Sequence, residues 1–212
     1  MIKNYLKLFV LIITVCISTE ACSQKVLPRN SLQIIGGYAR HGSGDLNGVV
    51  FGTEYLKYYT TKFSLNYNFR GTINYGKTVL IVNNAIDNRR TDASVRFTTA
   101  GIQIGVNAGL SLLRNSRNEI MTSLGVFGRF QSASNGSDGY QIYSPQSTGQ
   151  PTILIGYDNK TPQQTLSVGA IFQVQYSYTF NNKIFIGLVG GYQVDTNGDT
   201  VPQLAIAIGK RF

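Results

Sequence analysis

Apolar and polar residues alternate along most of the chain with a period of two residues. Between residues 99 and 112, every second residue from Ala100 onward is apolar, and the residues between them are small or polar. Residues 63–75 and 166–180 repeat the pattern, with Ile171 as an apolar exception on the polar face. Successive side chains of a strand point to opposite faces, so this period predicts β-strands with one apolar and one polar face.

The alternation predicts eight strands, each longer than is usual in soluble proteins. Strands in soluble proteins run to about 5–6 residues, whereas a tilted strand needs about 9–11 to cross a bilayer. Two strands do not show clearly which face points outward. Residues 183–194 are apolar on both faces, and in the second strand Leu56 shares a face with Glu54. The predicted strands are residues 31–40, 48–59, 62–75, 97–113, 118–131, 164–180, 183–194 and 201–212.

The connections between the predicted strands alternate between short and mostly longer. The short ones are residues 60–61, 114–117 and 181–182, whereas the others are near 41–47, 76–96, 132–163 and 196–200. Short turns at one end and longer loops at the other are typical of outer-membrane barrels. An even number of strands also brings both chain ends to the short-turn side.

Aromatic residues gather near both ends of the predicted strands. Because amphipathic rings prefer the headgroup layers of a bilayer, we expect two aromatic girdles. The candidates are Tyr59, Phe63, Tyr178, Phe180 and Phe212 at the short-turn end, and Tyr38, Tyr75, Phe130 and Tyr192 towards the loops.

The start of the chain differs from the rest and predicts a secretory signal. Lys3 and Lys7 precede an apolar run over residues 8–18, and small residues follow, so residues 1–23 are expected to be cleaved, leaving a barrel domain at 24–212. Cys22 leaves open a lipoprotein signal instead. Cleavage after residue 23 removes both cysteines, so the mature chain would have no disulfide and no cysteine metal site.

Composition supports one β-rich domain. The 212 residues include 23 Gly, 13 Tyr and 11 Phe, with 14% charged residues and a formal net charge of +9. No apolar run approaches the roughly 20 residues of a membrane-spanning helix.

With these features the chain resembles the small outer-membrane β-barrel family, the OmpA/OmpX-type eight-stranded barrels. The likeness is carried by the signal segment, the eight alternating strands and the final strand, Leu204–Phe212, with its terminal Phe. It implies an all-β, eight-stranded antiparallel up-and-down transmembrane β-barrel, inserted as a monomer into a Gram-negative outer membrane. It also implies that the barrel-assembly machinery recognises the last strand. The alternative is a soluble barrel or sandwich whose apolar faces point inward.

In a membrane barrel, the polar face would line the lumen, which eight strands leave only wide enough for side chains. A buried charge needs a partner, so we predict an interior ion-pair network in which Glu54 pairs with Arg70 or Arg129. Interior glycines at 101, 105, 109 and 169 would make room for longer side chains. The expected interior residues are Gln33, Glu54, Asn66, Asn68, Arg70, Gln103, Asn107, Arg129, Gln173, Gln175, Gln193, Gln203 and Arg211.

The two longest loops each contain two apolar runs too short to cross a membrane, at residues 78–82 and 91–95 and at residues 140–143 and 152–157. We expect both to form hairpins above the membrane, with edges that a partner protein could pair with. The outward cations Arg89, Arg90, Arg96 and Lys160 would face lipopolysaccharide, and no nucleic-acid module is present.

Candidate chemistry is sparse. His41 lies in the first loop with Ser43 and Asp45, which leaves open a lipid A-modifying enzyme. Residues 195–199 resemble the start of a calcium loop but lack its closing Glu, so a hairpin turn is favoured. We therefore expect no enzyme, metal or cofactor, and predict a structural or surface-interaction role with a plugged lumen. A lipid A-modifying enzyme and a narrow channel are the alternatives.

Overall fold

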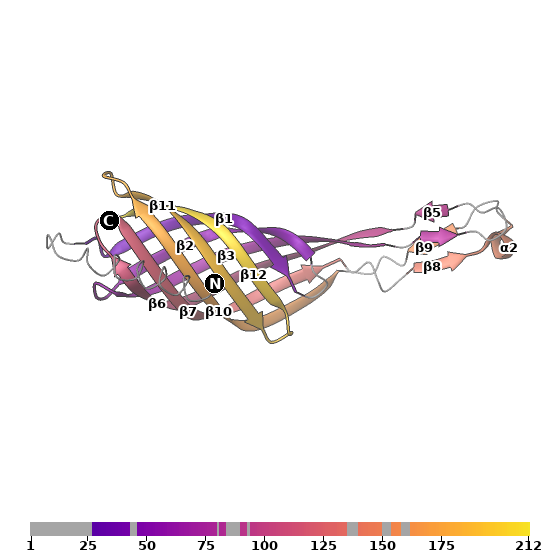
Figure 1. The fold of residues 1–212 in the computed structure, drawn as a ribbon. Helices are drawn as coiled ribbons and strands as arrows, with labels where there is room; N and C mark the ends of the chain where they lie inside the picture. Colours follow the sequence, from indigo (N-terminus) through magenta and orange to yellow (C-terminus); the bar gives the residue numbers. More distant parts are fainter. Residues whose placement is uncertain are drawn as a thin grey trace, which may run out of the picture.

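The computed structural model describes residues 27–42, 46–79, 81–83, 90–92, 94–134, 140–149, 154–157 and 162–212. The predicted signal segment therefore lies outside the described residues. Eight long strands form one closed antiparallel barrel, in which each strand pairs with the next along the chain and the last pairs with the first (Figure 1). The strands are β1 (Asn30–His41), β2 (Leu46–Tyr58), β3 (Phe63–Thr78), β6 (Val95–Arg114), β7 (Asn118–Ala133), β10 (Gln163–Thr179), β11 (Ile184–Asp195) and β12 (Thr200–Arg211).

All eight strands lie where the alternation predicts them, and the all-β up-and-down architecture is confirmed. The clearest difference in length is at β3 and β6, which together extend five residues beyond the predicted ends facing their shared loop. The reason is the ladder between them, which continues through Lys77 opposite Arg96 and Thr78 opposite Val95.

The polar face points into the barrel and the apolar face points outward. Arg70, Arg129 and Gln33 are fully buried inside, whereas Leu166 is 77% exposed and Ile104 is 66% exposed outside. The soluble alternative, with apolar faces meeting in the centre, is therefore wrong. In β11, Phe185 and Val189 point inward.

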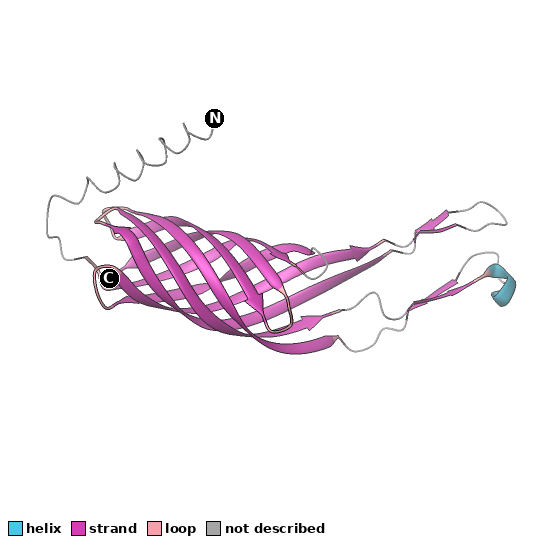
Figure 2. Ribbon diagram, turned by 60° about the horizontal axis from the view of Figure 1, so that its bottom comes forward, coloured by secondary structure: helices cyan, strands magenta, loops and turns pink. Residues whose placement is uncertain are grey.

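The two ends of the barrel differ as the connections predict. The short-turn end carries the β2–β3, β6–β7 and β10–β11 turns and the C-terminus, and the loop end carries the other four connections. Two hairpins lie beyond the loop end, as Figures 1 and 2 show. They are β4 (Ile81–Asn83) with β5 (Arg90–Asp92), and β8 (Tyr140–Tyr143) with β9 (Leu154–Tyr157), and a single helical turn, α2 (Pro145–Thr148), follows β8. Both hairpins expected in the long loops are thus confirmed.

Helices contribute little to this architecture. Among the residues described, none forms a helix with the length and apolar character needed to cross a membrane.

Candidate functional site

The middle of the lumen is bridged by hydrogen bonds between opposite walls. Nη2 of Arg70 donates to Oε2 of Glu54 at 3.2 Å and to Oε1 of Gln173 at 3.0 Å. Gln33 donates to the same Glu54 oxygen at 3.0 Å and exchanges hydrogen bonds with Gln175 at 3.2 and 2.9 Å. Because β3 and β10, and β1 and β10, are each three places apart around the barrel, these contacts cross the lumen. We call these five residues the middle layer.

Arg129 belongs to a second cluster, near the loop end. Its Nη1 donates to Oδ2 of Asp195 at 3.2 Å, its Nη2 donates to Gln103 at 3.0 Å and it also contacts Gln193. Of the two partners predicted for Glu54, Arg70 is the one that contacts it, whereas placing Arg129 in the same ion-pair network was wrong. Around the barrel, β7 is two strands from β11 but three from β2, and Arg70 already occupies the Glu54 carboxylate.

Asp195 also shapes the last hairpin turn. Its Oδ1 accepts hydrogen bonds from the backbone N–H groups of Asn197 and Asp199, at 3.0 and 3.1 Å, and Gly198 has a positive φ of 79°. This is turn geometry, as the sequence favours over a calcium loop. Within the described ranges, no group of three His, Cys, Asp or Glu residues is placed to hold a metal.

A third cluster closes the short-turn end, centred on Glu119, which the sequence analysis missed. Arg211 donates to Oε2 of Glu119 at 2.8 Å, the hydroxyl of Tyr58 donates at 2.9 Å, and Nε of Arg114 lies 3.4 Å from Oε1. Glu119 has the same parity in its strand as Arg129, and this signal could have placed it inside.

His41 lies buried at the loop-end mouth. Its Nε2 is 3.3 Å from Oδ2 of Asp199 and 3.3 Å from Oε1 of Gln131. These side chains border a cavity of about 390 Å³ that Thr165 also lines. The other two members of the candidate triad, Ser43 and Asp45, lie outside the described residues.

The nine candidate girdle residues all turn away from the lumen. Tyr178 is partly exposed and makes an edge contact with Phe180, with ring centres 5.3 Å apart, and the rings of Tyr59 and Phe63 are 6.5 Å apart. Tyr59, Phe63, Phe180 and Phe212 are exposed at the short-turn end, and Tyr38, Tyr75, Phe130 and Tyr192 are exposed towards the loops. Their role as a girdle stays a prediction.

The cations expected to face outward are only partly described. Arg90 and Arg96 are exposed, whereas Arg89 and Lys160 lie outside the described residues. At the base of the β4–β5 hairpin, Asp92 accepts hydrogen bonds from the hydroxyl and backbone N–H of Ser94, which hold the pKa of Asp92 below its usual value.

Comparisons with known proteins place the chain by its fold. No protein-family model and no curated protein matches it. Neisserial surface protein A is similar over 89% of this chain and 100% of its own, with 10% identity and a TM-score of 0.52. Ail, the attachment invasion locus protein of Yersinia pestis, is similar over 88% and 100%, with 11% identity and a TM-score of 0.46. The N-terminal β-barrel domain of Pseudomonas aeruginosa OprF is similar over 86% and 98%, with 12% identity and a TM-score of 0.46. At these identities the likeness concerns the fold alone, which is that of the small eight-stranded outer-membrane barrels.

Proposed function

We propose that this chain inserts as a monomer into the outer membrane of a Gram-negative cell and acts through the hairpins that it projects from the surface. One observation carries the proposal: a barrel with an apolar outer face encloses a lumen crossed by hydrogen-bonded polar side chains. Side chains such as Leu166, Ile104 and Leu124, at 77, 66 and 64% exposure, would be costly to leave in water as a continuous surface. A closed barrel also leaves no open strand edge, which hydrocarbon would not tolerate.

Heat-modifiable gel migration tests the insertion. A barrel extracted from membranes and kept unheated in detergent should migrate differently from the boiled protein, because the folded barrel resists the detergent until heated. A single band at one position, with and without boiling, would contradict the proposal.

Display of the hairpins at the cell surface can be tested separately. An epitope tag inserted at α2, in the long loop between β7 and β10, should bind antibody on intact cells. The matched control carries the tag between Asn181 and Asn182, in a short turn, and should bind only after permeabilisation. Equal labelling of both on intact cells would contradict the assigned orientation. A surface role through a protein partner would use the outer edges of the β4–β5 or β8–β9 hairpin, to which a partner could add a strand.

Lipopolysaccharide is the proposed partner of the outward cations at the loop end. Arg90 and Arg96 are exposed there and would contact its anionic groups. Because exposed charges are screened by salt, association of the purified protein with lipopolysaccharide should weaken as ionic strength rises. Association that is insensitive to salt would count against this partner.

We propose a non-enzymatic role over lipid A modification. In the described part of the chain, Nε2 of His41 contacts the carboxylate of Asp199 and the amide of Gln131, and neither is the serine hydroxyl that a deacylase would activate. Substitution His41→Ala should leave lipid A acylation of the host cell unchanged. A change in acylation would favour the enzyme.

A further inference from the structure

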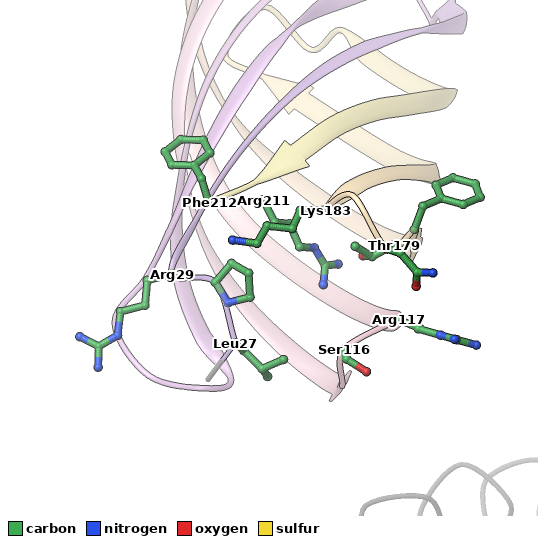
Figure 3. Close-up of a pocket in the computed structure, with 11 residues that line it drawn as sticks. Leu27, Arg29, Ser116, Arg117, Thr179, Lys183, Arg211 and Phe212 are labelled. Carbon is green, nitrogen blue, oxygen red and sulfur yellow. The ribbon is translucent and has the colours of Figure 1, made fainter. Parts of the chain in front are cut away.

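A cavity of about 690 Å³ opens at the short-turn mouth and is lined by four cationic side chains (Figure 3). Arg29 precedes β1, Arg117 lies in the β6–β7 turn, Lys183 lies in the β10–β11 turn and Arg211 ends β12. In Figure 3, Arg29 and Arg117 extend at opposite sides of the rim, with Lys183 and Arg211 between them. No Asp or Glu side chain of the described residues lines this cavity.

One carboxylate contacts this group of cations from outside the lining. Glu119 contacts Arg211, which lines the cavity, at 2.8 Å, and Arg114, which does not, at 3.4 Å. Glu119 and Arg114 together add no net charge, so they do not cancel the positive charge of the four lining cations. The net positive charge favours an anion in the cavity.

One further feature points to a bound ligand. Thr179 lines the cavity and is 5% exposed, yet its hydroxyl has no hydrogen-bond partner among the described residues. Such buried polar groups are normally paired. The positive φ of Lys183, 66°, is ordinary geometry for the last residue of this hairpin turn, where its backbone N–H donates to the carbonyl oxygen of Phe180 at 3.0 Å.

The lining of the cavity is apolar on its outer side. This feature helps to decide whether the anion is a lipid headgroup or a free ion. Phe180 and Phe212 line the cavity and are also 50 and 54% exposed on the outer face of the barrel. Cations therefore adjoin rings that would face acyl chains. This arrangement fits a headgroup whose tails lie against the barrel better than a free ion.

We propose that this cavity binds the phosphate group of an anionic phospholipid from the periplasmic leaflet. Arg117 and Lys183 contact the phosphate from the rim, Thr179 donates its hydroxyl, and Phe180 and Phe212 contact the upper acyl chains. The site rests on the proposed membrane insertion.

Native mass spectrometry of the barrel in an uncharged detergent tests the site with equimolar phosphatidylglycerol and phosphatidylethanolamine. The folded barrel should retain phosphatidylglycerol in preference. The double variant Arg117→Gln/Lys183→Asn should reduce this preference by roughly fivefold for each cation removed, since Asn tolerates the positive φ. The matched control, Lys57→Gln/Lys62→Gln, removes two exposed cations from the same end but outside the cavity, and should keep the preference.

Three outcomes would overturn the inference. The control variant could lose the preference as fully as the cavity variant, which would show a general effect of charge. The wild-type barrel could retain both lipids equally. Inorganic phosphate could displace phosphatidylglycerol at equimolar concentration, which would show that the cavity binds free phosphate and gains nothing from the lipid tails. Unboiled gel migration of the same preparation reports insertion separately, so failure of this site is distinguishable from failure of the proposed function.

Discussion

Gly169 lies on the inner face of β10, where the ring of Phe127 occupies the space that a side chain would fill. A Cβ at this position would lie 2.4 Å from Cζ of Phe127 and 2.4 Å from the carbonyl oxygen of Val194. The second contact is with backbone, which cannot rotate away. Substitution Gly169→Ala should therefore lower the free energy of unfolding in urea by about 1–3 kcal/mol.

Gly101 offers a matched control for this prediction. It also lies on an inner strand face, yet its nearest neighbour to an added Cβ is 3.4 Å away, an ordinary contact. Gly101→Ala should change stability by less than about 0.5 kcal/mol. Equal losses in the two variants would show that steric room at Gly169 does not limit the fold.

The Glu54–Arg70 pair is the second feature at the scale of single residues. Glu54→Gln removes the carboxylate and leaves the buried guanidinium of Arg70 without its charge partner, which should cost about 3 kcal/mol of unfolding free energy. Arg70→Met in the Glu54→Gln background should recover part of that loss, because it removes the unpaired charge. A double-mutant cycle measured by urea unfolding gives the coupling, and strictly additive losses would contradict a functional ion pair.

At the scale of elements, the β8–β9 hairpin is separable from the barrel. The ladder between β7 and β10 ends with Ala133 opposite Gln163, and β8 and β9 pair with each other beyond it. Replacing residues 135–161 by a four-residue turn should therefore leave heat-modifiable migration unchanged, since long surface loops are dispensable to a scaffold. Loss of the folded band in this variant would show that the hairpin supports the barrel.

The last strand, β12, carries a different prediction. Phe212→Ala should reduce the amount of barrel assembled in cells while leaving refolding in detergent intact, if the terminal ring is recognised during assembly. Phe180→Ala is the matched control, because Phe180 is a comparably exposed ring at the same end. Equal assembly of the two variants, measured as folded protein in the membrane fraction, would exclude a specific role for Phe212.

The elements also show what the sequence can predict. The strands and the inward face of Gln33, Glu54 and Arg70 follow from a period of two, which is a local property of the chain. The pairing of charges across the lumen, in contrast, does not depend on residues that are close in the sequence. Arg129 contacts Asp195 because of the order of strands around the closed barrel, and that order acts only once the barrel has closed. The cavity at the short-turn mouth likewise brings together four cations that lie far apart in the sequence, in two turns and at two strand ends.

For the whole molecule, three polar clusters lie in series along the lumen. The Arg129–Asp195 cluster closes the loop end, the middle layer crosses the centre and the Glu119 cluster closes the short-turn end. An ion that enters either mouth must break the contacts of all three to pass, and each includes a charged pair. An eight-stranded barrel is also only wide enough for its own side chains.

Purified barrel in a planar bilayer should therefore show no steady conductance. Substituting Gln33 and Gln175 by Ala removes two of the side chains that bridge the middle layer, yet the clusters at both mouths remain. This variant should also be silent, because closure in series requires only one intact layer. A steady current in the wild-type barrel would favour the narrow channel. A current that arises only in the double variant would show instead that the middle layer alone closes the lumen and that the two mouths are open to ions.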